Sequence, residues 1–470
     1  MSTPAHASAK MARVSRADLP LIRRAARGRA VCCMGTILGP RGYTDRRMPK
    51  ARPREVAIEI VRTLRDGGHV AYFAGGCVRD ELLARAPKDY DVATEAPPER
   101  VASLFRRTRE VGRAFGVMLV SISDVTVEVS TFRREHGYSD KRRPDAVTYC
   151  DAESDAHRRD FTINALFIDP LDVSDGPGGK VIDFAGGLAD LRAGVVRAVG
   201  DPERRLAEDH LRALRAVRFA ARLAFRIEDA TAGAIRRHAR ELEGVSRERI
   251  GDELRLMISD PRRAEALRLI ETMELDAPAL SEPARDPGAR GDLPSVALLP
   301  ERHVRFGLGL AAWAIDRHGR GRSGEEVARE ASGIADRWRR ALCLSNEETD
   351  ELRSTLTGVG VLESQWPGLT KARRKRAAAS GWFAGAKGLA RARRPEVCSR
   401  IEAEVEALGA EPGGLAPPPF VTGDDLIAAG LTPGPRFGKW LEDAYDAQLE
   451  GRISGRGEAL ALVKSWAEAK

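Results

Sequence analysis

The spacing of apolar residues changes along the chain and divides it into two parts. Apolar residues recur at helical spacing from about 54 to 66, and a short apolar run at 70–74 then predicts a buried strand that ends at two glycines. A helix is expected over 78–85. Further strands are predicted at 89–93, 117–122 and 125–132, where valines alternate with polar residues in the last of them. The first part is therefore expected to be a small mixed α/β unit.

After about residue 190 the strand pattern ends and helical periodicity continues in several segments, at 203–224, 229–242, 247–258 and 261–274. The stretch 276–300 is rich in Pro and Gly and is interpreted as a linker or long loop. A second such stretch, 411–419, sets off a last helical segment. The predicted fold class is α+β, with a mixed α/β region followed by helical domains.

Composition narrows the class of protein. A chain of 470 residues exceeds one ordinary core, and its net charge of +8 favours an anionic partner. The six cysteines form no CxxC pair, which favours reduced thiols in the cytoplasm over a disulfide framework or a zinc site. No apolar run approaches the ~18 residues that cross a bilayer, so we predict no membrane segment.

The N-terminal residues 1–47 are rich in Arg, poor in acids and aperiodic. This pattern is typical of an organelle-targeting peptide, and also of a disordered extension or a misplaced start codon. We favour the second interpretation, with Met48 as the functional start.

Two aspartates form the strongest candidate for a metal site. Asp89 and Asp91 are separated by one residue on a predicted strand, so their carboxylates are expected to point the same way. Two like charges held this close need a counterion, and Mg²⁺ is the natural choice for two-metal chemistry. A lone D-x-D is often only a solvated turn, but here it follows a strand, a glycine pair and a predicted helix. Glu128, on a neighbouring predicted strand, fits equally well as a third carboxylate or as a structural acid.

The glycine pair before that helix suggests an anion site. Gly75 and Gly76 allow a phosphate to approach the backbone, and the N–H groups at the helix start can hold it. Arg79, one turn later, would add positive charge.

A second candidate site lies in the segment 208–222, which is predicted to be one helix. Asp209, Arg212, Arg215 and Arg218 follow at three-residue steps beside an apolar stripe. A solvated arginine edge, or ion pairs within the helix, would produce the same pattern. The functional interpretation is that a carboxylate accepts hydrogen bonds and a guanidinium donates them, which matches the edges of cytosine and adenine. Uracil and guanine present the reverse arrangement.

The motifs occur in the order found in one family. The stretch Gly75–Thr94 is followed by RRDFTINAL at 158–166, and then by the segments 183–205, 208–225 and 246–254. Together they resemble the class II tRNA nucleotidyltransferases and bacterial poly(A) polymerases of the polymerase-β-like superfamily. The resemblance is strong from about 54 to 256 and weaker beyond.

The resemblance implies a division of the chain after the extension at 1–47. It comprises a catalytic nucleotidyltransferase head at 48–190, a neck that selects nucleotide and RNA at 191–260, a body at 261–410 and a tRNA-binding tail at 411–470. The implied activity is template-independent addition of C and A from CTP and ATP to the 3′ end of tRNA, with release of pyrophosphate. Asp89 and Asp91 would be catalytic and hold the metal. The implied nucleotide-binding residues are Gly76, Arg79, Arg159, Asp209, Arg212, Arg215 and Arg218.

Two alternative functions remain open, and so does the role of the basic runs. A poly(A) polymerase, or an enzyme that adds only CC or only A, shares these motifs, although the segment Tyr138–Asp145 favours the tRNA-end enzymes. A catalytically silent RNA-binding homologue would lack Asp89 or Asp91, and both are present. The basic runs 371–376 and 391–394 fit either a grip on the tRNA backbone or solvated helix faces. No obligate protein partner is inferred.

Overall fold

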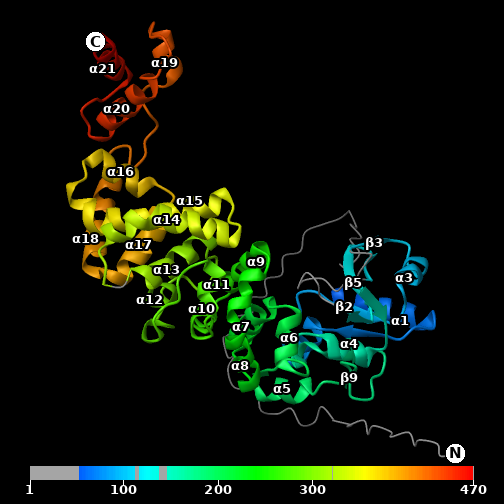
Figure 1. Cartoon of the computed structure of the whole chain (residues 1–470). Coiled ribbons are helices and arrows are strands. Elements are labelled where there is room, and N and C mark those ends of the chain that lie inside the picture. Colours follow the sequence, from blue (N-terminus) through cyan, green and yellow to red (C-terminus); the bar gives the residue numbers. More distant parts are fainter. Residues whose placement is uncertain (1–51, 112–115, 137–145, 320, 469–470) are drawn as a thin grey trace, which may run out of the picture. The chain divides into compact units, whose positions relative to one another are not determined.

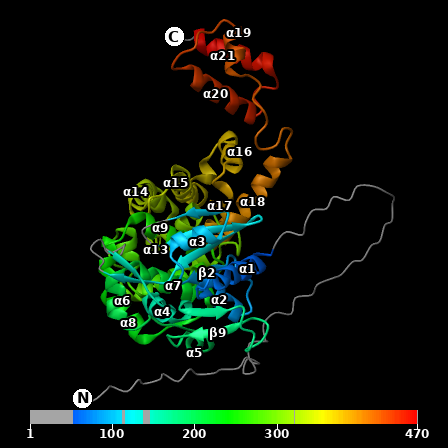
Figure 2. The same ribbon diagram turned by 90° about the vertical axis from the view of Figure 1, so that its right-hand side faces the viewer.

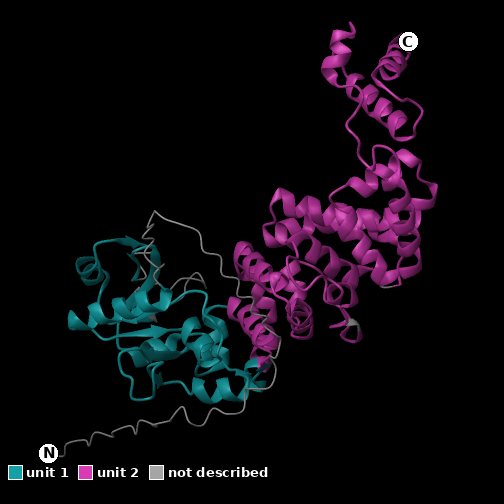
Figure 3. Ribbon diagram, turned by 180° about the vertical axis from the view of Figure 1, so that it is seen from behind, with its two compact units in different colours: residues 1–209, 226–231 teal, residues 210–225, 232–470 magenta. Residues whose placement is uncertain are grey.

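The computed structural model describes residues 52–468, apart from 112–115, 137–145 and 320. The N-terminal extension and the segment Tyr138–Asp145 therefore lie outside the described residues. The chain forms two compact units (Figure 3). The first extends to Asp209 and also includes Arg226–Thr231, and the second comprises His210–Phe225 and the chain from Ala232 onward.

A seven-stranded sheet forms the centre of the first unit (Figure 1). The strand order is β3-β4-β5-β2-β1-β8-β9, and β2 pairs with β5 in parallel while the other neighbours are antiparallel. The strands are β1 Ala71–Ala74, β2 Asp91–Thr94, β3 Thr108–Glu110, β4 Val117–Ile122, β5 Val125–Thr131, β8 Leu166–Asp169 and β9 Lys180–Asp183. The predicted strands at 70–74, 117–122 and 125–132 are confirmed, with Val127 and Val129 buried and Thr126 and Glu128 exposed.

Short helices and strand pairs complete this unit. They are α1 Pro53–Asp66, α2 Gly76–Leu82, α3 Pro98–Leu104, α4 Ala152–Arg158, α5 Gly187–Ala193 and α6 Pro202–Glu208, with the pairs β6 Arg133–His136 with β7 Ala146–Tyr149 and β10 Val195–Val196 with β11 Arg226–Ile227. The apolar face of α1, which includes Ile60 and Leu64, packs on β1, β2 and β5. The expected amphipathic helix is confirmed.

The second unit is helical. Its α helices are α7 Leu211–Leu223, α8 Asp229–Arg237 (which begins in the first unit), α9 Arg247–Ser259, α10 Arg263–Thr272, α11 Asp276–Leu280, α12 Pro294–Ala297, α13 Phe306–His318, α14 Gly324–Leu342, α15 Asn346–Gly360, α16 Lys371–Ala379, α17 Phe383–Arg393, α18 Pro395–Ala410, α19 Gly423–Ala428, α20 Phe437–Leu449 and α21 Arg456–Glu468. Helices α13, α14 and α15 pack side by side (Figures 1 and 2). Both α14 and α15 begin with a capping box, made by Ser323 with Glu326 and by Ser345 with Glu348. Across the described chain, every helix is too short or too polar to cross a bilayer.

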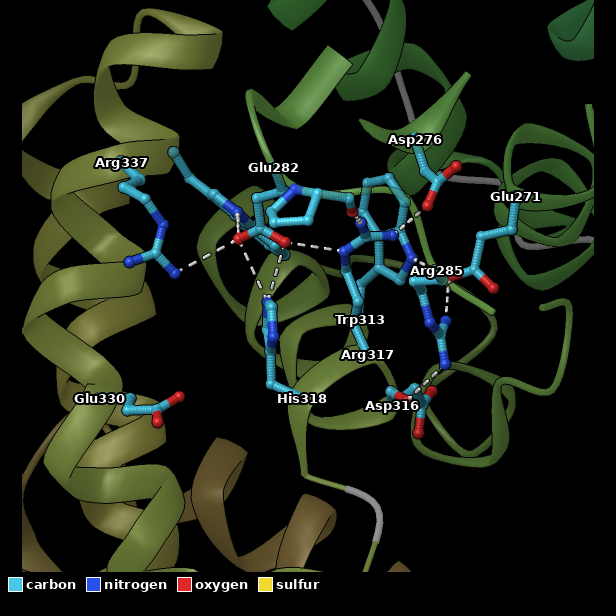
Figure 4. A network of polar contacts seen from close by, with 12 residues as sticks. Glu271, Asp276, Glu282, Arg285, Trp313, Asp316, Arg317, His318, Glu330 and Arg337 are labelled. Carbon is cyan, nitrogen blue, oxygen red and sulfur yellow. Dashed lines mark hydrogen bonds and ion pairs between the residues drawn. The ribbon is translucent and has the colours of Figure 1, made fainter. Parts of the chain in front are cut away.

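The prediction of a linker or long loop over 276–300 is correct only in part, since the residues between three short helical elements are irregular. This stretch contains α11, a 3₁₀ turn at Pro287–Ala289 and α12, and it packs against the helices around it. The Asp316 carboxylate accepts the backbone N–H groups of Ser295 and Val296, and Arg285 pairs with the buried Glu271 (Figure 4). Elements of three to five residues are too short to show helical periodicity, so the Pro and Gly content dominated the sequence pattern.

The single helix predicted over 208–222 is wrong. Helix α6 ends at Glu208, Asp209 has an extended backbone (φ −154°, ψ 103°), and α7 begins at Leu211. The three arginines do lie on α7, but Asp209 lies outside it. A two-residue break leaves the apolar spacing of the two helices nearly in phase, which is why the pattern looked continuous.

Candidate active site

Two carboxylates meet where β2 and β5 run in parallel. Asp91 is the first residue of β2, and the register places it opposite Glu128 on β5. Asp89 lies before the strand, in a bend, with its side chain 75% exposed and its Oδ2 3.9 Å from Lys88 Nζ. The strand predicted from Asp89 therefore begins two residues later, and strand alternation does not fix the direction of the Asp89 side chain.

The surroundings of Asp91 disfavour its charged form. Burial raises the pKa of Asp91 to about 6, with further contributions from the negative charges of Glu128 and Asp89, while Arg159 opposes the shift. A bound cation would relieve this repulsion. No three His, Cys, Asp or Glu side chains among the residues described here already form a metal cage. Mg²⁺ needs no such cage, because one or two carboxylates with substrate phosphates and waters complete its coordination.

The glycine turn and Arg159 lie against each other beside this pair. Gly75 has φ +72°, and a Cβ at this position would lie 3.2 Å from Arg159 Nη1. The backbone conformation of the turn therefore favours glycine, and a side chain there would also crowd the guanidinium. Helix α2 begins directly afterwards, at Gly76.

Arg159 is held from several sides. Its Nε and Nη2 donate to Asp155 Oδ2 at 3.1 and 2.9 Å, its Nη1 donates to the Asn164 carbonyl at 3.2 Å, and the Phe167 ring centre lies 4.9 Å away. Asp155, which the sequence analysis missed, is buried and also binds Arg158. Its spacing of three and four residues from the two arginines on a helix was the signal that could have identified it.

Arg79 is directed into the protein. It is buried, its Nε and Nη2 donate to Asp80 Oδ1 at 2.9 and 2.8 Å, and its Nη1 donates to Asn164 Oδ1 at 2.7 Å. Asn164 in turn donates from Nδ2 to Asp160 Oδ1 at 3.0 Å. These contacts connect α2 to the turn that follows Arg159, and they give Arg79 a structural role in the state described.

The candidate base-reading residues lie in both units. Asp209 ends the first unit, whereas Arg212, Arg215 and Arg218 lie on α7 in the second. Arg212 is buried, and Arg218 Nε donates to Glu253 Oε2 at 2.6 Å. Arg215 Nη1 lies 3.8 Å from Glu253 Oε1. Glu253, on α9, was not identified from the sequence.

Six of the eight basic residues in the runs 371–376 and 391–394 form ion pairs. In the first run, Lys371 and Lys375 pair with Glu411, Arg374 pairs with Glu404 and Arg376 pairs with Asp446. In the second run, Arg391 pairs with Glu402 and Arg393 with Glu363. These charges join α16, α17 and α18 to their neighbours, which favours a structural role over a free surface for RNA.

The sequence and the fold both match known proteins. The family model for the poly A polymerase head domain matches residues 71–197, and the model for the probable RNA and SrmB-binding site of polymerase A matches residues 224–283. The CCA-adding enzyme of Limosilactobacillus fermentum is 32% identical over 425 residues, which cover 86% of this chain and 95% of that one. The CCA-adding enzyme of Lactobacillus helveticus is 38% identical over 260 residues, 55% of this chain, and the match spans only 62% of that relative's length.

A solved structure has the same fold. The crystal structure of the Bacillus stearothermophilus CCA-adding enzyme in complex with CTP superposes with a TM-score of 0.68 at 27% identity. The match covers 89% of this chain and 98% of that one.

Proposed function

The chain belongs to the family of CCA-adding enzymes, and we propose that it adds C and A from CTP and ATP to the 3′ end of tRNA. The observation that carries this proposal is the pair Asp91 and Glu128 on adjacent strands, beside the Gly75 turn and Arg159. The division into head, neck, body and tail is part of the same proposal. A cytoplasmic location is supported by the free thiols of Cys77, Cys150, Cys343 and Cys398.

The site is suited to in-line transfer of a nucleotidyl group. Asp89 and Asp91 would hold Mg²⁺, which supplies charge for the attacking and leaving oxygens. The Gly75–Gly76 turn leaves room for the triphosphate, and Arg159 directs positive charge to the same place. The tRNA 3′-hydroxyl would attack the α-phosphate and pyrophosphate would leave, while Glu128, opposite Asp91, would help to remove the proton of that hydroxyl. Arg79 would stabilise this site indirectly, because its hydrogen bonds to Asp80 and Asn164 hold α2 against the turn that follows Arg159.

Selection of the base is assigned to Asp209 and Arg212. An ionised carboxylate accepts from the amino group of cytosine or adenine, and a guanidinium donates to the neighbouring ring nitrogen. Uracil and guanine would leave these groups unpaired, at a loss of about 1–3 kcal/mol for each. Arg215 and Arg218 are proposed to contact the triphosphate or ribose. When the nucleotide binds, they would give up some of their contacts with Glu253.

The activity is tested with tRNA that lacks its 3′ end. Purified protein with Mg²⁺ and radiolabelled nucleotides is expected to add C residues from CTP alone, and C followed by one A from both nucleotides. Long A tails from ATP alone would identify a poly(A) polymerase instead. Addition that stops after CC, or that requires a CC end and adds only A, would identify the narrower tRNA enzymes.

Replacing Asp209 by asparagine is expected to weaken the choice of base. The carboxamide both donates and accepts, so it can meet the acceptor oxygen of uracil. UTP incorporation relative to CTP should rise about tenfold or more, measured as the ratio of the two kcat/KM values. Asp252→Asn on α9, where the side chain is 73% exposed, is the control and should leave the ratio unchanged. An unchanged ratio in Asp209→Asn would exclude Asp209 from base selection.

A further inference from the structure

Arg205, on α6 of the first unit, contacts two other backbone segments and a side chain at the end of its own helix. Its Nε donates to the Val199 carbonyl at 3.0 Å, and its Nη1 donates to Glu208 Oε2 at 2.7 Å. Its Nη2 donates to the His157 carbonyl, and Nη1 also lies 3.5 Å from the carbonyl oxygen of Arg158. The side chain is only 16% exposed, although its bond to the His157 carbonyl lies at the surface.

The partners of Arg205 lie next to the two residues that define the proposed nucleotide site. Arg158 directly precedes Arg159, and Glu208 directly precedes Asp209. The turn after Arg159 is itself fixed to the Val199 segment, because the Val199 N–H donates to the Asp160 carbonyl at 3.2 Å. One guanidinium therefore holds the end of α6 to the segment that carries Arg159.

This contact of Arg205 bears on the position of Asp209, which lies just beyond the end of α6. Asp209 follows the last turn of α6 with an extended backbone, so the helix does not itself fix the direction of the chain there. The bond between Arg205 and Glu208 anchors the residue immediately before it. A group that reads a base by hydrogen bonding must be held to within about 0.5 Å to reject the wrong base.

We propose that Arg205 is a positioning residue that fixes Asp209 relative to Arg159, and that it thereby contributes to the selection of C and A over U and G. This inference rests on the proposed function, and it adds a residue that need not contact the nucleotide. Lysine cannot replace Arg205 fully, since one ammonium does not present the planar fork that reaches four separate acceptors.

The chain offers a matched control one residue away. Arg204 also lies on α6 and its Nε is 3.5 Å from Glu208 Oε1, but its side chain is 80% exposed. It has the same charge and the same acidic partner, but among the contacts of the described residues it makes no hydrogen bond to the backbone of the Arg158 or Val199 segments. Arg204→Lys therefore measures what an Arg-to-Lys change on α6 does to the ratio when no hydrogen bond to the Arg158 or Val199 segments is lost.

The experiment compares kcat/KM for CTP and for UTP on tRNA lacking its 3′ end, in Arg205→Lys, Arg204→Lys, Asp209→Asn and the double variant Arg205→Lys/Asp209→Asn. Arg205→Lys is expected to lower the CTP-to-UTP ratio about tenfold, and Arg204→Lys should leave it unchanged. In the double variant the ratio should be no lower than in Asp209→Asn alone, because both changes act through one carboxylate.

The outcomes separate the inference from the function on which it rests. If the CTP-to-UTP ratio falls in Asp209→Asn but not in Arg205→Lys, the positioning role is overturned. It is also overturned if the double variant shows the sum of the two single effects on the free-energy scale. A ratio that stays constant in Asp209→Asn overturns the base-reading proposal itself. Glu208→Gln removes the charged partner of both Arg205 and Arg204. Because Arg204→Lys should leave the ratio unchanged, a lower ratio in Glu208→Gln is assigned to Arg205, which covers the case in which Arg205→Lys folds poorly.

Discussion

Replacing Asp91 by asparagine is expected to lower nucleotide incorporation roughly a thousandfold or more, because a lost metal ligand removes several kcal/mol of transition-state stabilisation. Burial and the neighbouring Glu128 raise the pKa of Asp91, so its charged form is unfavourable in the folded state. The same change should therefore leave the free energy of unfolding of the metal-free protein unchanged or increase it. A neutral amide avoids that repulsion.

The measurement is single-turnover incorporation of CTP on tRNA lacking its end, together with chemical denaturation without Mg²⁺. Asp124→Asn is the matched control, since Asp124 is an exposed aspartate at the turn between β4 and β5 of the same sheet. It should change neither quantity. Full incorporation by Asp91→Asn would refute the two-metal assignment, whereas a large loss of stability would show that Asp91 serves the fold.

The sequence indicated which residue types form this candidate site, but not how they lie relative to one another. The motif around Asp89 and Asp91 was sufficient to predict two carboxylates, a glycine turn and a following helix. It did not reveal that Glu128 lies opposite Asp91, because the register between β2 and β5 depends on two segments more than thirty residues apart. The sequence also did not show that Arg79 is buried against Asp80 and Asn164, since that contact joins α2 to a turn beyond β7.

The predicted base-reading segment illustrates a different limit. Spacing correctly placed Arg212, Arg215 and Arg218 on one helix, since all three lie within α7. Spacing alone failed at Asp209, where the chain leaves one helix and enters another with a similar apolar phase. Hydrophobic periodicity shows which face of a segment is apolar over a window of many residues, so a break of two residues does not change it noticeably. Contacts such as those of Arg205, which span 48 residues to His157, have no sequence signature at all.

A buried ion-pair network in the second unit is the other place where polar residues determine the structure. Glu282 lies at its centre (Figure 4), and its carboxylate accepts from Arg317 Nε at 2.8 Å and from Trp338 Nε1 at 2.7 Å. His318 and Arg337 approach the same carboxylate from α13 and α14. Arg317 also pairs with Asp276 at the start of α11. The network thus attaches the Pro-rich 276–300 stretch to two long helices, which a linker would not require.

Glu282→Ala is therefore expected to lower the free energy of unfolding by about 3–5 kcal/mol, because the buried N–H groups of Arg317 Nε and Trp338 Nε1 lose their acceptor and Arg317 keeps Asp276 as its charged partner. Glu330→Ala is the control, since Glu330 on α14 is a half-exposed partner of Arg322 and should change stability by about 0.5 kcal/mol or less. Urea denaturation of both variants gives the comparison. A loss below about 1 kcal/mol for Glu282→Ala would mean that the network does not hold the stretch in place.

The same carboxylate predicts how stability depends on pH. Burial alone would raise the pKa of Glu282, but the interactions with His318, Arg317 and Trp338 outweigh it and lower the pKa to about 2, from a usual 4.5. A depressed pKa means that the contribution is complete above about pH 5 and is lost as the pH falls from there towards 2. A difference of this size corresponds to roughly 3 kcal/mol. Between pH 5 and pH 2 the wild-type protein should therefore lose more stability than Glu282→Gln, and parallel curves would show that other carboxylates account for the acid sensitivity.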